Sequence, residues 1–579
     1  MIPTRDLSAV TSHLNSGAYK SALKLAKRLQ KAYPRDPIPL NIAGICLSAM
    51  TKLPEAIVQF QRALKIDPGF IDARHNLAQT LILAGRFELA IKLASPLRDT
   101  DSKACFFLAQ AQFQIGALVD AEAAIDQALV LNPAFAPALN LRGLILNSQG
   151  REIEAISAFE AALAVDPDNV ETLVNISLPL ARQNRHKDGH QMVERAVQLA
   201  PSHIGARLRL GTSFVEAGDY RRAKEQFLAI LRLDPSHPQA FHQLTRLLDR
   251  EELTSLEAPV TKALKNERAG SSGAAELHFA LSRIQEAGGN KSAAAKSRHL
   301  ANGILAKLFP YDAQQDTEET GRILARFPTA TAALVEHPQG PFPIYVLGLP
   351  RSGTSLVEAM LSRLANVATL GERAATGVLV QDSLANDLPF DAQAAEAFVR
   401  QDRAMLPELG PDTLAYVDKM PENYRYIGFL CTAYPQCRIV HVRRDPRDVA
   451  LSMWKSFFSG RALAYTYDQA AMAHRFGLYA RLMDHWTKVF PDQIITLAYE
   501  DLVSDPVGAS KSIADFCGLT WAPEMAAPQD SDAPTLTASA SQIRQPVHQR
   551  SVGTWRNHSG DLGEFLAALD TSLWPDLPA

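Results

Sequence analysis

The sequence predicts two architectures in one chain: an all-α solenoid of repeated helix pairs, followed by an α/β domain with a parallel sheet. Two residue series that recur with one period in the N-terminal half indicate the solenoid. Short apolar runs that alternate with helical stretches in the C-terminal half indicate the α/β domain. At 579 residues the chain exceeds what one hydrophobic core supports, so at least two domains are expected.

The first series is proline, with three consecutive intervals of 34 residues. It comprises Pro34, Pro68, Pro133, Pro167, Pro201 and Pro235. The second series lies about half a repeat away and is mostly glycine: Gly17, Thr51, Gly85, Gly116, Gly150, Asn184 and Gly218. A small residue stands five positions after each of these, at Ala22, Ala56, Ala90, Ala121, Ala155, Gly189 and Ala223. The one break is a three-residue shortening between Gly85 and Gly116, where Ser102 takes the expected proline position.

Each repeat is expected to be a helix, a turn that tolerates left-handed backbone, a second helix whose small residue admits its partner closely, and a terminating proline. This pattern resembles the tetratricopeptide repeat, whose period is 34. We predict seven units over residues 1–236. The resemblance implies a superhelix whose concave face binds a peptide or another protein. No residue in the repeats is a catalytic candidate.

Residues 237–338 are interpreted as degenerate helical repeats and linker helices that cap the array. The stretch LHFALSRIQEAGGNKSAAAKSRHLANGILAKLF keeps helical spacing around a Gly-Gly turn, and ERAGSSGAAE before it is a local break. A proline-rich boundary at 338–343 then starts a new domain, predicted at 339–579.

The C-terminal domain begins with an apolar run at 344–348, IYVLG, which leads through a glycine loop into SLVEAMLSRLA, a segment with helical periodicity. Further apolar runs lie at 413–417, 438–442 and 494–499. Alternation of this kind predicts a parallel sheet covered by helices. Ligands of such sheets bind at the carboxyl ends of the strands, where the glycine loop lies.

The glycine loop, LGLPRSGTSL, is P-loop-like because Gly348 and Gly353 have the spacing of a phosphate-binding loop. Thr354 and Ser355 stand where a nucleotidase would have Lys followed by Ser or Thr. Successive amides from Arg351 to Ser355 at a helix N-terminus form an oxyanion nest, and Gly353 is expected to allow close approach of the anion. The loop therefore predicts oxyanion binding without the lysine that reaches the terminal phosphates of ATP.

A second anion site is predicted in RIVHVRRDPRDVALSMWKSFF. A strand delivers Arg443 and Arg444 at its carboxyl end, and a helix begins near Asp445 and Pro446. Ser452 and Ser456 then share one helix face, so guanidinium and hydroxyl groups together can hold a phosphate. The alternative is that Arg444 pairs with Asp445 and that the serines are merely solvated.

Four motifs follow one another in the C-terminal half. They are LPRSGTSL, then Glu372 in LGE 21 residues after Arg351, then DKMPENYRYIGFL, then VRRDPRDVALSM. In the order and spacing of these motifs, the chain from residue 344 to about 557 resembles the sulfotransferase superfamily, particularly the branch that contains tyrosylprotein sulfotransferase. The resemblance implies 3′-phosphoadenosine-5′-phosphosulfate (PAPS) as sulfuryl donor, with no metal. It implies that the loop holds the 5′-phosphosulfate through Pro350, Arg351, Ser352, Gly353, Thr354 and Ser355, and that Arg444 and Ser452, eight residues apart, hold the 3′-phosphate.

The same resemblance implies three catalytic residues. Arg351 and Lys419 are expected at the bridging oxygen of the leaving phosphate, where charge builds in a loose, in-line transition state. Glu372 is expected to accept the proton of the attacking hydroxyl. The alternatives are an exposed surface lysine for Lys419 and a helix-stabilising carboxylate for Glu372. Other sulfotransferases use a histidine base, for which His548 lies in a plausible segment.

The C-terminal stretch TASASQIRQPVHQRSVGTWRNH resembles the segment that covers the cofactor. Ser539, followed by Gln542 and Ile543, matches a sulfate-contacting serine. Where the tyrosylprotein branch has a lysine before tryptophan, this chain has Thr554 before Trp555; Arg550 and Arg556 are the candidate replacements. Tyr499 corresponds to a family tyrosine near the nucleotide, with a buried strand tyrosine as the alternative.

Composition limits the function classes. With 47% apolar and 21% charged residues and a net charge of −3, the chain lacks the basic excess of a nucleic-acid-binding protein. Five scattered cysteines without a CxxC pair argue against a zinc site and a disulfide framework. We find no signal segment and no run of about 18 apolar residues, which favours a cytoplasmic protein without a membrane span.

The function predicted from the sequence is PAPS-dependent sulfotransfer to an acceptor hydroxyl, with the repeats recruiting the acceptor or a partner. The resemblance suggests peptide tyrosine as acceptor, while a glycan, a lipid or a small alcohol is also compatible. A P-loop-type kinase is the first rival reading, and Thr354 in the lysine position opposes it. A nucleotide-binding scaffold with a protein-binding role is the second. Whether the chain forms a homodimer is left open.

Overall fold

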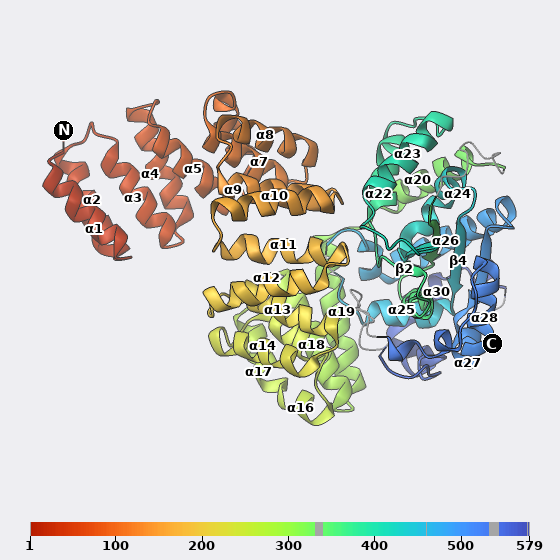
Figure 1. Ribbon diagram of the computed structural model, residues 1–579. Coiled ribbons are helices and arrows are strands. Elements are labelled where there is room, and N and C mark those ends of the chain that lie inside the picture. Colours follow the sequence, from red (N-terminus) through yellow and green to blue (C-terminus); the bar gives the residue numbers. More distant parts are fainter. Residues whose placement is uncertain (1, 330–339, 459, 532–543, 576, 578–579) are drawn as a thin grey trace. The chain divides into compact units, whose positions relative to one another are not determined.

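The computed structural model describes residues 2–329, 340–458, 460–531, 544–575 and 577. The chain divides into two compact units, Met1–Pro179 and Leu180–Ala579, and the division falls within helix α11 (Val170–Arg182). The predicted fold class, a helical solenoid followed by an α/β domain with a parallel sheet, is confirmed (Figure 1). The predicted domain boundaries at 236 and 338 stay predictions, because the compact units divide the chain elsewhere.

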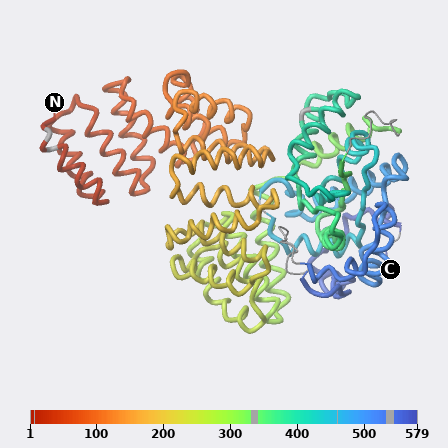
Figure 2. The backbone as a smooth tube through the Cα atoms, viewed as in Figure 1, coloured from red at the N-terminus to blue at the C-terminus, as the bar shows by residue number. Residues whose placement is uncertain are grey.

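The N-terminal unit consists of consecutive helices that run back and forth as pairs (Figure 2). They are α1 (Thr4–Asn15), α2 (Tyr19–Ala32), α3 (Ile38–Ala49), α4 (Leu53–Ile66), α5 (Ile71–Leu83), α6 (Phe87–Ala94), α7 (Ser102–Gln114), α8 (Leu118–Leu131), α9 (Ala136–Ser148) and α10 (Glu152–Val165), followed by the start of α11.

The two residue series of the repeats have the structural roles predicted for them. All seven predicted turn residues have left-handed backbone, with φ from 58° at Thr51 and Asn184 to 80° at Gly116 and Gly218. The six alanines that follow these turns are fully buried, at 0% exposure, where the two helices of a pair meet. Seven helix pairs, α1 to α14, therefore occupy the predicted repeat region.

The second unit continues with helices before its sheet begins. They are α12 (His186–Leu199), α13 (Ile204–Ala217), α14 (Tyr220–Leu233), α15 (Pro238–Leu244), α16 (Arg250–Ser255), α17 (Glu257–Asn266), α18 (Ser272–Ala287), α19 (Lys291–Leu308) and α20 (Ala313–Arg326). The predicted Gly-Gly turn joins α18 to α19, where Gly289 has φ of 85°.

The sheet has five parallel strands in the order β2-β3-β1-β4-β5. The strands are β1 (Phe342–Leu347), β2 (Val367–Thr369), β3 (Ala415–Asp418), β4 (Arg438–Arg443) and β5 (Ile494–Ala498). The α-helices among and after them are α21 (Thr354–Leu361), α22 (Ala375–Ala385), α23 (Ala392–Ala404), α24 (Ile427–Ala433), α25 (Pro446–Trp454), α26 (Gln469–Val489), α27 (Tyr499–Ser504), α28 (Pro506–Cys517) and α30 (Gly563–Ala568). Short 3₁₀ helices of the whole chain are η1 (Ser95–Leu97), η2 (Pro421–Tyr426), η3 (Ala464–Tyr467), η4 (Pro523–Ala526), η5 (Pro528–Asp530), η6 (Thr554–Leu562) and η7 (Thr571–Leu573).

Apolar cores cover both faces of this sheet. Along β1, Ile344 and Val346 face one core, and Tyr345 and Leu347 face the other, as the alternation of a strand requires. Because β1 is central and buried on both faces, its carboxyl end lies in the middle of the sheet edge. The glycine loop therefore follows the central, buried strand of the sheet.

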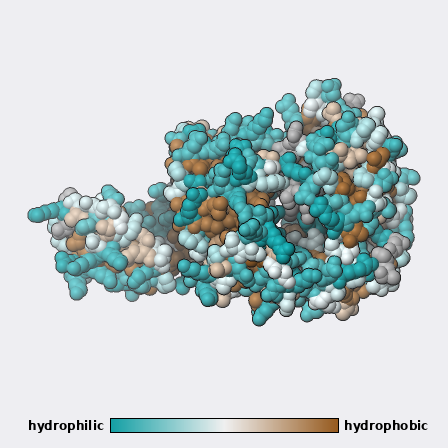
Figure 3. Space-filling view, turned by 90° about the horizontal axis from the view of Figure 1, so that it is seen from below, coloured by the Kyte–Doolittle hydropathy of each residue, from teal (hydrophilic) through white to brown (hydrophobic). Residues whose placement is uncertain are grey.

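Hydrophilic residues cover most of the face drawn in Figure 3, and hydrophobic residues gather there in small groups. No helix within the described ranges combines the length and the apolar character that crossing a bilayer requires.

Candidate active site

The glycine loop joins β1 to α21 at the carboxyl end of the central strand. Arg351 and Gly353 both have left-handed backbone, with φ of 73° and 112°. No side chain caps α21, and its first two residues, Thr354 and Ser355, line a cavity. One part of the predicted nest differs, because the Ser352 amide donates to the Leu349 carbonyl at 3.0 Å.

The predicted cofactor-binding residues of the loop separate into two groups. Arg351, Gly353, Thr354 and Ser355 line a cavity of about 400 Å³, whereas Pro350 and Ser352 are buried behind it. The Ser352 hydroxyl is buried and has no hydrogen-bond partner within the described chain. An unpartnered buried hydroxyl is costly, and this one lies behind the cavity instead of in its lining.

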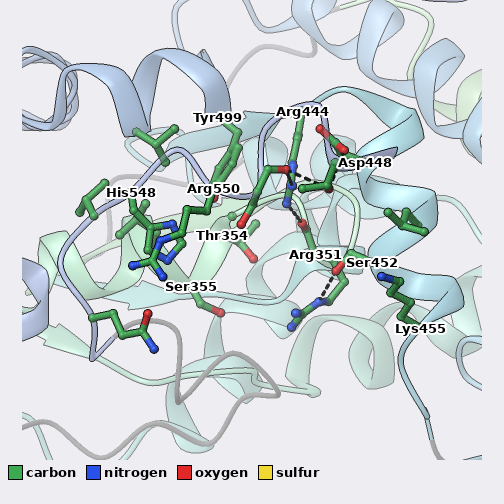
Figure 4. Close-up of a pocket in the computed structure, with 18 of the residues that line it drawn as sticks. Arg351, Thr354, Ser355, Arg444, Asp448, Ser452, Lys455, Tyr499, His548 and Arg550 are labelled. Carbon is green, nitrogen blue, oxygen red and sulfur yellow. Dashed lines mark hydrogen bonds between the residues drawn. The ribbon is translucent and has the colours of Figure 1, made fainter. Parts of the chain in front are cut away.

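Arg351, Arg444 and Ser452 meet in the wall of the same cavity (Figure 4). The Arg351 Nε donates to Ser452 Oγ at 3.0 Å, and Arg444 Nη1 donates to the Arg351 carbonyl at 3.1 Å. The structure thus brings together residues that lie 93 and 101 positions apart in the sequence. The two predicted anion sites form one continuous surface.

Asp445 forms its ion pair with Arg447, and not with Arg444 as the alternative interpretation had it. Asp445 caps α25 by accepting from the Arg447 amide at 2.9 Å, and its carboxylate pairs with the Arg447 guanidinium at 2.8 Å. Ser456 donates to the Ser452 carbonyl at 2.7 Å and stays outside the cavity lining. Ser452 is therefore the serine of α25 that faces the cavity.

Tyr499 lies in this wall as well and is not a strand tyrosine, since it begins α27. The Arg444 guanidinium lies 4.4 Å from the centroid of its ring. A Cβ on Gly353 would come within 2.5 Å of that ring. The absence of a side chain at Gly353 thus admits Tyr499, whereas the sequence had suggested that it admits the anion.

Cations dominate the cavity lining. Arg351, Arg444, Lys455 and Arg550 line it, against the carboxylates of Asp448 and Glu286. Burial, and then the like charges of Arg444 and Arg246, lower the pKa of Arg351 to about 10, so it remains charged at neutral pH. Crowded like charges of this kind favour an anionic occupant.

Glu372 and Lys419 pair with each other and are not among the residues that line this cavity. The Lys419 Nζ is 2.5 Å from Glu372 Oε1 and 3.9 Å from Glu358 Oε2. Lys419 follows β3 and is fully buried, which excludes the surface-lysine alternative, while the Glu372 side chain is 45% exposed. The proposed base is thus the open member of the pair.

The loop that carries Glu372 is fixed from α21. Glu358 Oε1 accepts from the Gly371 amide at 3.0 Å, and burial raises the pKa of Glu358. The Lys419 amide donates to the Gly371 carbonyl at 2.9 Å. Helix α22 begins only at Ala375, and Glu372 pairs with Lys419 instead of capping it.

Asp448 on α25 fixes the C-terminal segment. It accepts hydrogen bonds from the Gly553 amide at 2.6 Å, the Thr554 hydroxyl at 3.0 Å and the Trp555 amide at 2.9 Å. Thr554 is therefore engaged with Asp448. Of the two candidate replacements for the family lysine, Arg550 lines the cavity and Arg556 lines a separate hollow of about 320 Å³.

The remaining predicted residues have different outcomes. Ser539, Gln542 and Ile543 lie outside the described residues. His548 lines the cavity, and its Nδ1 is buried without a partner in the described chain. No group of three or more His, Cys, Asp or Glu side chains within the described ranges could hold a metal ion.

Sequence reasoning missed four charged residues of the site: Glu286, Glu358, Asp448 and Lys455. Glu358 and Asp448 had a signal, because each is a carboxylate within a largely apolar helix. Lys455 directly follows α25, and Glu286 belongs to α18. Nothing in the local sequence distinguishes Glu286 from a solvated helix residue.

Comparison with known proteins gives matches to two families. The model of the sulfotransferase family matches residues 343–523. Two models of the tetratricopeptide repeat match residues 47–104, and 108–170 with 208–241.

Three relatives illustrate the range of similarity. An uncharacterized protein of Aquifex aeolicus (strain VF5) is 26% identical over 363 residues, which are 59% of this chain and 47% of that protein. Heparan sulfate glucosamine 3-O-sulfotransferase 6 of Homo sapiens is 36% identical over 98 residues, 15% of this chain and 29% of that protein. A putative protein-tyrosine sulfotransferase of Caenorhabditis briggsae is 25% identical over 228 residues, 37% of this chain and 80% of that protein.

The chain spans about half the length of the first relative and under a third of the second. The family matches cover separate parts of the sequence, in the same order as the two predicted architectures. The chain therefore combines tetratricopeptide repeats with a C-terminal domain of the sulfotransferase family.

Proposed function

We propose that the chain transfers a sulfuryl group from PAPS to an acceptor hydroxyl. The observation that carries this proposal is the meeting of a lysine-free glycine loop with Arg444 and Ser452 in one cationic cavity. The sulfotransferase family match over residues 343–523 supports it.

The residues present fit such a donor. The cavity of about 400 Å³ suits a nucleotide-sized ligand. One buried polar atom of a lining residue, Arg444 Nε, has no partner in the described chain and can donate to an oxygen of an anionic ligand. The glycine loop would hold the 5′-phosphosulfate, and Arg444 with Ser452 would hold the 3′-phosphate. When bound, PAPS supplies a sulfuryl group whose bond to the 5′-phosphate oxygen breaks as a bond to the acceptor oxygen forms.

The chain's own residues then have distinct tasks. Glu372 is the base that accepts the acceptor proton, because it is the exposed member of a pair whose partner is fully buried. Arg351 and Lys419 stabilise the negative charge that develops on the leaving phosphate. The ion pair at 2.5 Å orients the carboxylate, and Glu358 holds the loop that carries it.

We assign the acceptor to the class of hydroxyl compounds, with peptide tyrosine as the first candidate. The likeness to a putative protein-tyrosine sulfotransferase favours tyrosine, whereas the likeness to a heparan sulfate sulfotransferase favours a glycan hydroxyl. The repeats would recruit the acceptor or a partner protein, since helical repeats of this type present a concave surface. A cytoplasmic location belongs to the same proposal.

The direct test is transfer of label. The purified full chain is incubated with PAPS carrying radioactive sulfur and a cell extract, and the labelled molecule is identified. We expect label in an acceptor, which alkaline hydrolysis and mass spectrometry of the intact labelled molecule assign to tyrosine, a sugar or another alcohol, because acid would cleave the sulfate ester. Calorimetric heat with ATP and magnesium but none with PAPS or adenosine 3′,5′-bisphosphate would instead favour the kinase reading.

A further inference from the structure

Lys455 lies in the cavity wall and is held there by a residue from the helical array. Its Nζ is 2.7 Å from Glu286 Oε1 and 3.1 Å from His558 Nε2. Glu286 is in the last turn of α18, far in sequence from the sulfotransferase match at 343–523. Lys455 and Glu286 both line the cavity.

Glu286 is itself firmly held. Its Oε2 accepts from Arg298 of α19 at 2.9 Å, and the same guanidinium, 2% exposed, also pairs with Asp561. Two cations and two carboxylates therefore balance in this cluster. The carboxylate is a fixed anchor for Lys455 rather than a mobile surface group.

The ammonium group of Lys455 has more N–H donors than Glu286 and His558 engage. An ammonium carries three N–H groups, of which Glu286 and His558 engage two. Lys455 is three residues after Ser452, so the two side chains lie on one face of the helix end, and Figure 4 shows them on the same side of the cavity. A donor on this side of the cavity can reach the ligand group that Ser452 contacts.

We propose that Lys455 is a further binding residue for the 3′-phosphate of the nucleotide, and that Glu286 of the helical array is the residue that positions it. This rests on the proposed function and adds one cation to the grip of Arg444 and Ser452. The Thr554 hydroxyl donates to Asp448, so Thr554 does not supply the phosphate contact that the resemblance assigns to a lysine at this position. In this proposal Lys455 supplies a cation instead. The helices before residue 343 thus become part of the donor site.

Calorimetric titration of the full chain tests Lys455. Lys455→Ala should bind adenosine 3′,5′-bisphosphate at least tenfold more weakly than wild type, while its affinity for adenosine 5′-monophosphate changes less than twofold. Lys488→Ala is the matched control, because Lys488 is exposed on α26, pairs with Asp484 four residues before it and does not line the cavity. Unchanged bisphosphate affinity in Lys455→Ala, or an equal loss with both nucleotides, would overturn the assignment. If wild type itself fails to bind the bisphosphate, the proposed function is what fails.

The role of Glu286 is tested by measuring whether the effect of its substitution depends on Lys455. Glu286→Gln should weaken bisphosphate binding about threefold or more, and Glu286→Asp should recover part of the loss. In the Lys455→Ala background Glu286→Gln should have no further effect, because its influence passes through the ammonium. Additive losses in the double variant, with a lowered melting temperature, would show a merely structural role and refute the positioning claim.

Discussion

Replacing Arg444 by alanine should weaken nucleotide binding more than any other single change in the cavity. Its guanidinium donates to the Arg351 carbonyl at 3.1 Å and to the Ser551 carbonyl at 2.6 Å, so it ties the glycine loop to the covering segment. Its contact with Tyr499 at 4.4 Å orders a further wall of the cavity.

The magnitude follows from what the substitution removes from the bound state. A hydrogen bond from the guanidinium to the 3′-phosphate contributes about 1.5–3 kcal/mol, and the ring contact that orders this wall about 1 kcal/mol. Together they predict a loss of roughly 2.5–4 kcal/mol, which corresponds to about 10²- to 10³-fold weaker binding of adenosine 3′,5′-bisphosphate. Isothermal titration calorimetry measures this directly.

Arg447→Ala is the matched control, because Arg447 also lies over an aromatic ring, at 4.1 Å from Trp555, but does not line the cavity. It should retain nucleotide affinity within a few-fold even where its melting temperature falls. Affinity of Arg444→Ala within threefold of wild type would refute the reasoning, as would an equal loss in both variants.

Four further outcomes are expected. Glu372→Gln should lose at least two orders of magnitude in transfer rate with unchanged bisphosphate affinity, as expected when a general base is removed; a binding defect with normal turnover would contradict this. Lys419→Ala should lower kcat by about two orders of magnitude, and full turnover would reject its role. Gly353→Ala should lower both the melting temperature and nucleotide affinity, because its φ is 112° and the added Cβ would meet Tyr499 at 2.5 Å; a stable, tightly binding variant would disprove the packing argument. Burial lowers the pKa of His441 to about 3, below the usual value near 6.5. The unfolded chain therefore binds a proton at His441 at higher pH than the folded chain does. The free energy of unfolding is unaffected by this group above about pH 6.5 and falls by up to ~1.4 kcal/mol per pH unit as the pH drops toward 3. His441→Gln should therefore show a shallower decline of melting temperature between pH 6.5 and 4.5, and an unchanged slope would count against this origin.

Much of the fold was predictable because backbone constraints are local. A left-handed turn, a small residue at a helix contact and a terminating proline each leave a mark in the sequence, and the turn residues have the φ values that the pattern requires. Strands β1, β3, β4 and β5 were visible as apolar runs. Strand β2 was not visible in this way, because its three residues, Val367–Thr369, are too few to stand out as an apolar run.

The sequence predicted which residue types form the site, but not which of these side chains form hydrogen bonds or ion pairs with one another. Arg351, Arg444 and Ser452 were expected to bind two ends of a nucleotide, and the structure joins them directly. The pair of Glu372 with Lys419 could not be read from the sequence, since 47 residues separate them. Such pairings depend on which strand ends become neighbours, and this is a property of the whole sheet.

The contribution of Glu286 was hidden for a related reason. Helical periodicity identified α18 but gives no information about what its last turn will face. Only the packing of α18 and α19 in the second unit places this carboxylate at Lys455. A residue of the helical region that contributes to the cavity of the sheet domain can therefore be identified only from the three-dimensional structure.

The most direct test of the account is an experimental structure of the full chain with adenosine 3′,5′-bisphosphate. We predict one phosphate within hydrogen-bond distance of the loop at residues 351–355 and the other between Arg444 and Ser452, with Glu372 facing the 5′ end. A nucleotide absent from this cavity, or bound with its 3′-phosphate away from Arg444, would contradict the account.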